Sequence, residues 1–311
     1  MPPHAPEISR LRRWLGPLYI TGVFWFRIHL FGVRAVPTLL FAPFIALFAA
    51  LFTLALRNVR AALGSNLEAV LGPVTGPWGW WERQLRAYRT IHVFSWCLTE
   101  RYERLATRRP FTVNAEGLDH WRELNESGRG FLLVTAHLGC WEVGSMLPSC
   151  QEARRVHVVR EAEIDPAAQK FFAELIRTQS NGLYTTHFAE DPHLGMDLLD
   201  ALREGEIVAL QGDRPRVGGR VEELKLFGRP FPKPIGPAVL ARAAGAPLLP
   251  VFVFRDGRRR YRCSIRPPVH VPHTADRNAD VEQALQSLAT ELEWAISQRP
   301  YQWFCFRKLW E

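Results

Sequence analysis

Two side chains with catalytic potential follow a short apolar stretch near the middle of the chain. Residues 131–136 are uncharged and lie between glycines, so they are predicted to form a buried strand. His137 comes directly after this stretch, and Glu142 follows it beyond Gly139, which permits a sharp turn. A histidine at a strand end can accept a proton, and a nearby carboxylate can orient its ring and stabilise the cation. The alternative is a loop on which both side chains face solvent.

Three more polar residues follow other predicted strands. Arg160 ends the stretch VHVV, and its planar guanidinium is suited to binding a phosphate. Asp213 and Arg214 follow the stretch IVAL, where they can form an ion pair or contact a substrate. Ligands of α/β proteins bind at the carboxyl ends of the strands, so we expect these side chains on the same edge of the sheet as His137. Taken singly, Arg160 fits an exposed residue after a strand better, whereas Asp213 and Arg214 fit a solvent-exposed turn equally well.

A glycine at a predicted helix start is a further candidate for binding. Gly236 follows an apolar, proline-rich loop, and unpaired N–H groups at a helix start favour anions. The chain contains neither the phosphate-loop pattern nor the G-x-S-x-G turn of serine hydrolases. Its five cysteines and its histidines also lack any paired metal-ligand spacing. The sequence therefore predicts no metal and no cofactor.

Strands and helices are predicted to alternate from residue 109 onward. The candidate strands are residues 111–115, 131–136, 155–159, 207–211, 247–254 and 261–265. The candidate helices are residues 167–180, 193–203, 236–244 and 279–297, three of which end near a glycine. This alternation is typical of an α/β fold with a largely parallel central sheet flanked by helices.

The first 108 residues have a different character and are predicted to form a helical, membrane-associated region. Residues 1–60 contain seven arginines and one acidic residue, Glu7, within a net charge of +8 for the whole chain. Residues 35–56 carry no charge, and about 20 apolar residues are enough to cross a bilayer. Pro37 and Pro43 also permit a kinked or half-inserted helix. A basic, aromatic-rich arm indicates an anionic membrane surface rather than nucleic acid. The alternative is a buried hairpin of a soluble protein.

These motifs occur together in the order seen in one known family. His137 and Glu142 form H-x-x-x-x-E, Arg160 lies in VHVVRE, and Gly212-Asp213-Arg214, LFG and the ending RPYQWFCFRKLW follow in sequence. The chain resembles the bacterial lipid A biosynthesis (lauroyl/myristoyl) acyltransferases of the lysophospholipid acyltransferase superfamily. The resemblance spans nearly the whole chain. Asp213-Arg214-Pro215 stands where many lipid A enzymes carry Asp-Gln or Asp-His, and related enzymes acylate mannosylated phosphoinositides.

The resemblance implies an O-acyltransferase on the cytoplasmic face of the bacterial inner membrane. A fatty acyl group would pass from acyl carrier protein or CoA, as a thioester, to a hydroxyl of a lipid or glycolipid. His137 would be the general base, Glu142 its orienting carboxylate, and Arg160 a phosphate ligand. Two other classes remain open, namely a non-catalytic lipid-binding scaffold of the same fold and a metal-dependent hydrolase.

Overall fold

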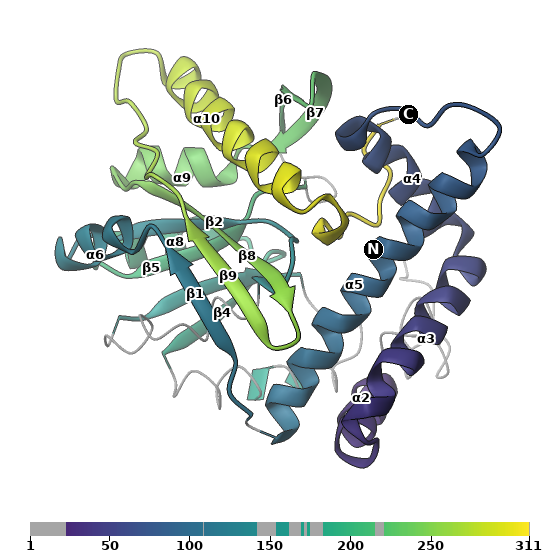
Figure 1. Ribbon diagram of the computed structural model, residues 1–311. Helices are drawn as coiled ribbons and strands as arrows, with labels where there is room; N and C mark the ends of the chain where they lie inside the picture. The colour runs from purple at the N-terminus through teal and green to yellow at the C-terminus, as the bar shows by residue number, and fades with distance from the viewer. Residues whose placement is uncertain are drawn as a thin grey trace, which may run out of the picture.

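The computed structural model describes residues 23–107, 109–141, 154–161, 169–170, 173–174, 183–214 and 221–310. Within these residues a seven-stranded sheet forms the centre of the molecule, and helices cover it (Figure 1). The strand order is β1-β9-β8-β2-β5-β3-β4. All neighbouring pairs are parallel except β8 and β9, which form an antiparallel hairpin. The predicted α/β class with a largely parallel sheet is therefore confirmed.

The strands of this sheet are short and mostly apolar. They are β1 (Thr112–Glu116), β2 (Phe131–Thr135), β3 (Val156–Arg160), β4 (Tyr184–Phe188), β5 (Ile207–Gln211), β8 (Leu248–Gly257) and β9 (Arg260–Ile265). A separate antiparallel hairpin consists of β6 (Val221–Leu226) and β7 (Arg229–Pro234). Six of these strands lie where the sequence predicted them, to within three residues at either end, whereas β4, β6 and β7 were not predicted.

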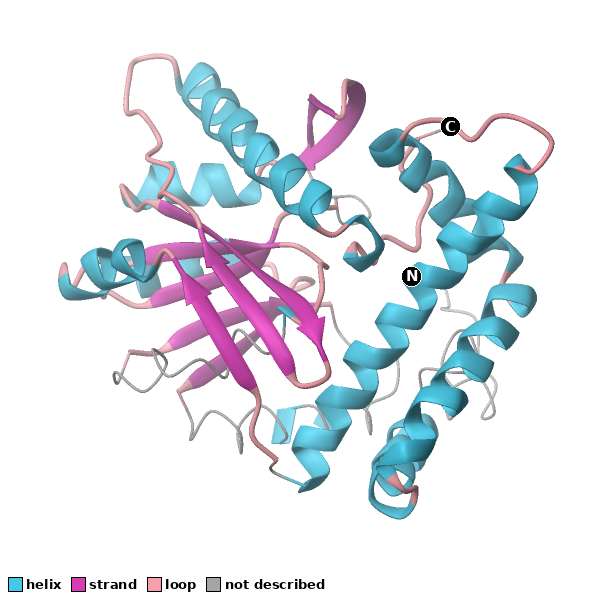
Figure 2. Ribbon diagram, in the orientation of Figure 1, coloured by secondary structure: helices cyan, strands magenta, loops and turns pink. Residues whose placement is uncertain are grey.

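The two faces of the sheet are covered by different helices (Figure 2). One face packs against α8 (Leu194–Arg203), α9 (Gly236–Ala244) and α10 (Arg277–Gln298). The other packs against α6 (Leu118–Glu126) and α5 (Gly79–Thr107). In β2, Leu132 and Val134 face the first layer, while Phe131 and Leu133 face the second. This period of two is what a strand buried on both faces requires. The predicted helix at residues 167–180 falls mostly outside the described residues.

The N-terminal region is helical in its described part, as predicted. Its elements are α2 (Val23–Ala35), the short 3-10 helix η1 (Thr38–Leu40), α3 (Phe41–Ala55) and α4 (Arg57–Leu71). Both α2 and α3 pack along α5, so these helices lie side by side at one flank of the sheet (Figure 1). Because α5 also packs on the sheet, it joins the two parts of the chain. The division into regions 1–108 and 109–311 stays a prediction.

The C-terminal segment connects α4 to the rest of the fold. It contains the 3-10 helix η4 (Pro300–Gln302), after which the described residues up to 310 form no further helix or strand. Asn66, which is 1% exposed, donates from Nδ2 to the carbonyl oxygens of Cys305 (3.0 Å) and Arg307 (2.7 Å). Its Oδ1 accepts from the backbone N–H of Leu309 at 3.1 Å. One buried amide thus satisfies three backbone groups of a segment that has no sheet partner along most of its length.

We expect Asn66→Ala to lower the free energy of unfolding by about 3 kcal/mol, because buried backbone groups would lose their partners. Ser65→Ala is the matched control, since Ser65 gives the same segment one part-buried hydrogen bond, to the carbonyl of Trp310. The control should cost less than about 1.5 kcal/mol. Denaturant unfolding curves measure both variants. Equal losses would contradict the role given to Asn66.

Candidate functional site

The carboxyl ends of three parallel strands bring the predicted polar residues to one edge of the sheet. Thr135, the last residue of β2, is paired with Gln211, the last residue of β5. His137 and Asp213 each lie two positions beyond these paired ends, so the chain leads both side chains to the same place. Arg160 ends β3, which pairs with β5 on its other side. The predicted common edge is therefore present.

His137 and Asp213 form a hydrogen bond at this edge. Nδ1 of His137 lies 2.8 Å from Oδ1 of Asp213, and Nε1 of Trp303 donates to Oδ2 of the same carboxylate at 3.2 Å. The Asp213 side chain is 0% exposed, whereas that of His137 is 19% exposed. An ionised carboxylate only accepts hydrogen bonds, so Nδ1 must carry the hydrogen. The lone pair of Nε2 is then the one able to accept a proton.

The charge state of Asp213 is well determined by its neighbours. Burial by itself raises the pKa of the Asp213 carboxyl, but the charge and hydrogen bond of His137, together with Arg214, lower this pKa to about 2. Asp213 is therefore ionised near neutral pH. A buried carboxylate in this state stabilises an imidazolium more strongly than a solvated one does, because less water screens the charge.

The backbone around His137 is held by hydrogen bonds to other segments. The N–H of Phe304 donates to the carbonyl of His137 at 2.8 Å, and the N–H of Gly139 donates to the carbonyl of Gln302 at 2.8 Å. Gly139 has φ 57°, in the left-handed region. A Cβ on it would lie 2.1 Å from the carbonyl oxygen of Val253. Only glycine fits this turn, and the turn directs the chain away from the sheet immediately after His137.

The other predicted site residues are less closely grouped. Arg160 is half-buried, and because β5 lies between β2 and β3 it is about 10 Å across the sheet from the His137 strand. Arg214 is half-buried next to Asp213, and Gly236 is the exposed first residue of α9. Glu142, predicted to orient His137, lies outside the described residues, so its role stays a prediction.

Trp303 is a site residue whose contact the sequence did not reveal. It is 1% exposed and belongs to the C-terminal segment, whose resemblance to a family ending was the only signal. No spacing rule links it to Asp213, 90 residues earlier in the chain. Because Trp303 donates a hydrogen bond to Oδ2 of Asp213, the carboxylate is held with Oδ1 directed toward His137.

Two histidines that could have been metal ligands are paired elsewhere in the sheet. Nδ1 of His157 in β3 lies 2.8 Å from Nε2 of His187 in β4, and Glu206 bonds to the other side of the His157 ring. In the part of the chain that the structure describes, no group of three or more His, Cys, Asp or Glu side chains could hold a metal ion.

The chain is similar to several known proteins. The family model described as "Bacterial lipid A biosynthesis acyltransferase" matches residues 2–311. The phosphatidylinositol mannoside acyltransferases of two Mycobacterium tuberculosis strains, CDC 1551 / Oshkosh and ATCC 25618 / H37Rv, are each 26% identical over 195 residues. Each match covers 62% of this chain and 58% of the relative, so the chain spans less than two thirds of their length.

A solved structure also aligns with the chain. It is the 1-acyl-sn-glycerophosphate (LPA) acyltransferase PlsC from Thermotoga maritima, with 14% sequence identity and a TM-score of 0.37. The alignment covers 81% of this chain and 98% of that one.

Gly139→Ala should lower the free energy of unfolding by about 2 kcal/mol or more, because the added Cβ meets a backbone oxygen at a positive φ. Gly64→Ala is the control, since a Cβ on this residue of α4 meets nothing within 4 Å. It should be neutral or stabilising by up to about 1 kcal/mol. Thermal unfolding of the two variants decides the question, and a harmless Gly139→Ala would show that the turn does not need glycine.

Proposed function

Because this chain belongs to the bacterial lipid A biosynthesis acyltransferase family, we propose that it transfers a fatty acyl group from an acyl thioester to a hydroxyl of a lipid or glycolipid. The donor is acyl carrier protein or CoA carrying the chain as a thioester. One observation supports the proposal most directly, namely the 2.8 Å hydrogen bond between His137 Nδ1 and Asp213 Oδ1 at the strand ends. This hydrogen bond keeps the hydrogen on Nδ1 of His137, so Nε2 is free of hydrogen and suited to act as the general base.

The reaction needs a base because an alcohol has a pKa far above neutral. Nε2 of His137 accepts the hydroxyl proton as the oxygen attacks the thioester carbonyl and forms a tetrahedral intermediate. The intermediate expels the thiolate, which takes the proton back from the imidazolium. Asp213 stabilises the imidazolium between these two steps. The products are an ester of the acceptor and the thiol of the carrier, so every proton is accounted for.

The remaining predicted residues have supporting roles in this proposal. Arg160 binds a phosphate of the donor or acceptor, since its guanidinium offers paired donors at the same sheet edge as His137. Arg214 adds positive charge beside the site, and the helix start at Gly236 offers N–H groups to an anion. Glu142, predicted from its spacing to orient His137, would stabilise the imidazolium through its charge, because Asp213 and the acceptor hydroxyl occupy both ring nitrogens.

A non-catalytic scaffold of the same fold is a weaker proposal. Such a protein would have no need for an ionised carboxylate with 0% exposure beside a partly exposed imidazole. Taking a charge out of water costs several kcal/mol unless its partners compensate, so apolar residues would serve a scaffold better. The buried Asp213 therefore favours the enzyme.

We also propose that the protein acts on the cytoplasmic face of the bacterial inner membrane, as the family resemblance implies, and the N-terminal helices support binding to a membrane. The stretch Thr38–Ala55 is long and apolar enough to cross a bilayer, and 22% of it is buried. One face of α3 packs against the rest of the protein, and the opposite face exposes Phe44, Leu47, Leu51 and Leu54. The helix α5 beside it carries charged residues along its length. A helix packed on such a neighbour is suited to lying in the membrane interface rather than crossing it.

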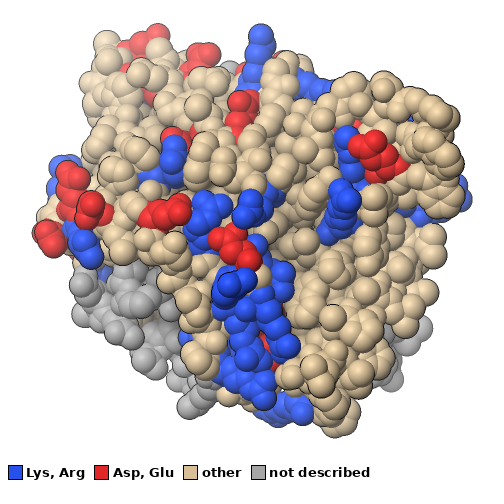
Figure 3. Space-filling view, in the orientation of Figure 1, with Lys and Arg blue, Asp and Glu red and all other residues tan. Residues whose placement is uncertain are grey.

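A basic surface adjoins this apolar helix. Figure 3 shows Lys and Arg side chains gathered on this face of the molecule, and the turn between β8 and β9 contributes Arg258 and Arg259 to the described surface. Both pair with the buried Glu103 of α5, which holds them in position. The guanidinium carbon of Arg258 lies 5.5 Å from the ring centroid of Phe41, at the start of α3. Arginines beside an exposed apolar helix are suited to anionic lipid head groups.

His137→Ala and Asp213→Asn should each reduce acyl transfer by about 10²–10⁴-fold, because they remove the base or the group that fixes its tautomer. The purified protein is given acyl carrier protein or CoA thioesters and a total lipid extract, and products are detected by mass spectrometry as lipids heavier by one acyl group. His270→Ala, at an exposed position, is the control and should remain active. Substantial activity in His137→Ala would refute the mechanism.

Phe44→Asp combined with Leu47→Asp should weaken binding to phosphatidylglycerol vesicles at least about tenfold, because two large apolar side chains leave the lipid. Met196→Asp on α8 is the control, since Met196 is comparably exposed, at 59%, on a different part of the fold. Vesicle flotation at low and high salt measures the binding. Unchanged flotation of the double variant, or release only by detergent, would contradict an interfacial helix.

A further inference from the structure

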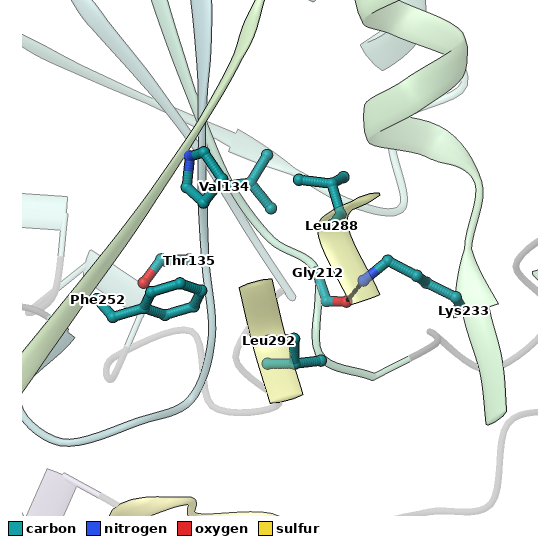
Figure 4. Close-up of a pocket in the computed structure, with 8 residues that line it drawn as sticks. Val134, Thr135, Gly212, Lys233, Phe252, Leu288 and Leu292 are labelled. Atoms are coloured by element: carbon teal, nitrogen blue, oxygen red, sulfur yellow. Dashed lines mark hydrogen bonds between the residues drawn. The ribbon is translucent and has the colours of Figure 1, made fainter. Parts of the chain in front are cut away.

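A fully buried lysine lies next to the catalytic carboxylate. Lys233 belongs to β7 and is 2% exposed. Its Nζ donates to the carbonyl oxygen of Gly212, the residue before Asp213, at 3.3 Å. Figure 4 shows the side chain extending from its strand toward Gly212, with the bond drawn between them. Lysine is almost never fully buried without a partner, so this placement calls for a reason.

The surroundings of Lys233 are mostly apolar. A small cavity with a volume of about 10 Å³, the size of one water molecule, lies beside it. Its lining is mostly apolar and includes Val134, Phe252, Leu288 and Leu292 beside Gly212 and Lys233. Burial lowers the pKa of the Lys233 ammonium to about 8, while the charge of Asp213 partly opposes this shift. The side chain therefore keeps its positive charge at neutral pH, despite the low-dielectric surroundings.

The groups that can influence this lysine are few within the described residues. Asp213 is the charge that acts on it, and α10 contributes only Leu288 and Leu292 to the cavity. The nearby acids of α10 are engaged elsewhere, since Glu293 accepts from the backbone of Phe227 and Glu291 pairs with Arg266.

On its other sides, Asp213 meets groups already described and one thiol. His137 and Arg214 both act on its carboxylate. Burial raises the pKa of the Cys305 thiol to about 11, with Asp213 adding to the increase, so this thiol is neutral at working pH. The charges around Asp213 are thus His137 when protonated, Arg214 and Lys233.

We propose that Lys233 is a positioning residue, which holds the Gly212–Asp213 turn and whose positive charge partly offsets Asp213, so that His137 remains unprotonated and able to accept a proton at neutral pH. This inference rests on the function proposed above. Arg214 already supplies one countercharge to Asp213, and without Lys233 the carboxylate would hold the imidazolium more strongly, so the base would be less available when the alcohol arrives. A second cation near the same carboxylate opposes that protonation.

The test is the pH profile of kcat/KM for acyl transfer. Methionine has a side chain of similar shape to that of lysine but carries no charge. In Lys233→Met, the acid limb of the kcat/KM profile should move to higher pH by about one unit, because His137 gains its proton more readily. The two profiles should converge above about pH 9, where Lys233 of the natural protein is itself largely neutral. Lys225→Met, on the exposed face of β6, is the matched control and should leave the limb in place.

Lys233→Gln separates the hydrogen bond from the charge, because glutamine can still donate to the Gly212 carbonyl. The proposal expects its acid limb to move as in Lys233→Met. A limb unchanged in both variants would overturn the proposal, and so would failure of both to fold, since the lysine would then serve stability alone. If His137→Ala is inactive while these limbs do not move, only the role of Lys233 fails; an active His137→Ala would refute the proposed function itself.

Discussion

The hydrogen bond between His137 and Asp213 depends on the pairing and register of two neighbouring parallel strands, β2 and β5. The two residues are 76 positions apart in the chain, and they meet because β2 and β5 are neighbours whose last residues are paired. His137 and Asp213 each lie two residues beyond these paired ends, so the imidazole and the carboxylate come together. The constraint on the rest of the fold is to bury that carboxylate, with its other oxygen bonded to Trp303, while leaving the ring partly exposed. A buried ionised acid is costly, so every partner it has contributes to keeping the site intact.

The C-terminal segment connects this site to the N-terminal helices. Trp303 bonds to Asp213, Gln302 accepts from Gly139, and the residues that follow are bonded to Asn66 of α4. In the proposed function these helices lie on the membrane, where the acceptor lipid is found. A short, well-bonded path therefore runs from α4 to the carboxylate beside His137. This arrangement gives a physical reason for a long helical region and an aromatic-rich ending in one chain.

Much of the sheet could be predicted, because its central strands are apolar on both faces and end at glycines or charged residues. The strands that were missed lack this signal. β4 reads YTTHF and is half-buried throughout at the sheet edge, and β7 reads RPFPKP, in which prolines argue against a strand. At the site, His137 and Asp213 were predicted for the same edge, but not as partners, since strand order cannot be read from strand composition. Lys233 was missed because it lies between two prolines in a segment that resembles a loop.

The central claim is that His137 takes the proton from the acceptor hydroxyl. An experimental structure with a non-hydrolysable acyl thioester analogue and an acceptor lipid measures this most directly, through the distance from the hydroxyl oxygen to Nε2 of His137. The account predicts about 2.6–3.2 Å, with Nδ1 still bonded to Asp213 and the thioester carbonyl carbon next to the same oxygen. A hydroxyl bound beside another group, or a His137 ring turned away from Asp213 in that complex, would contradict it.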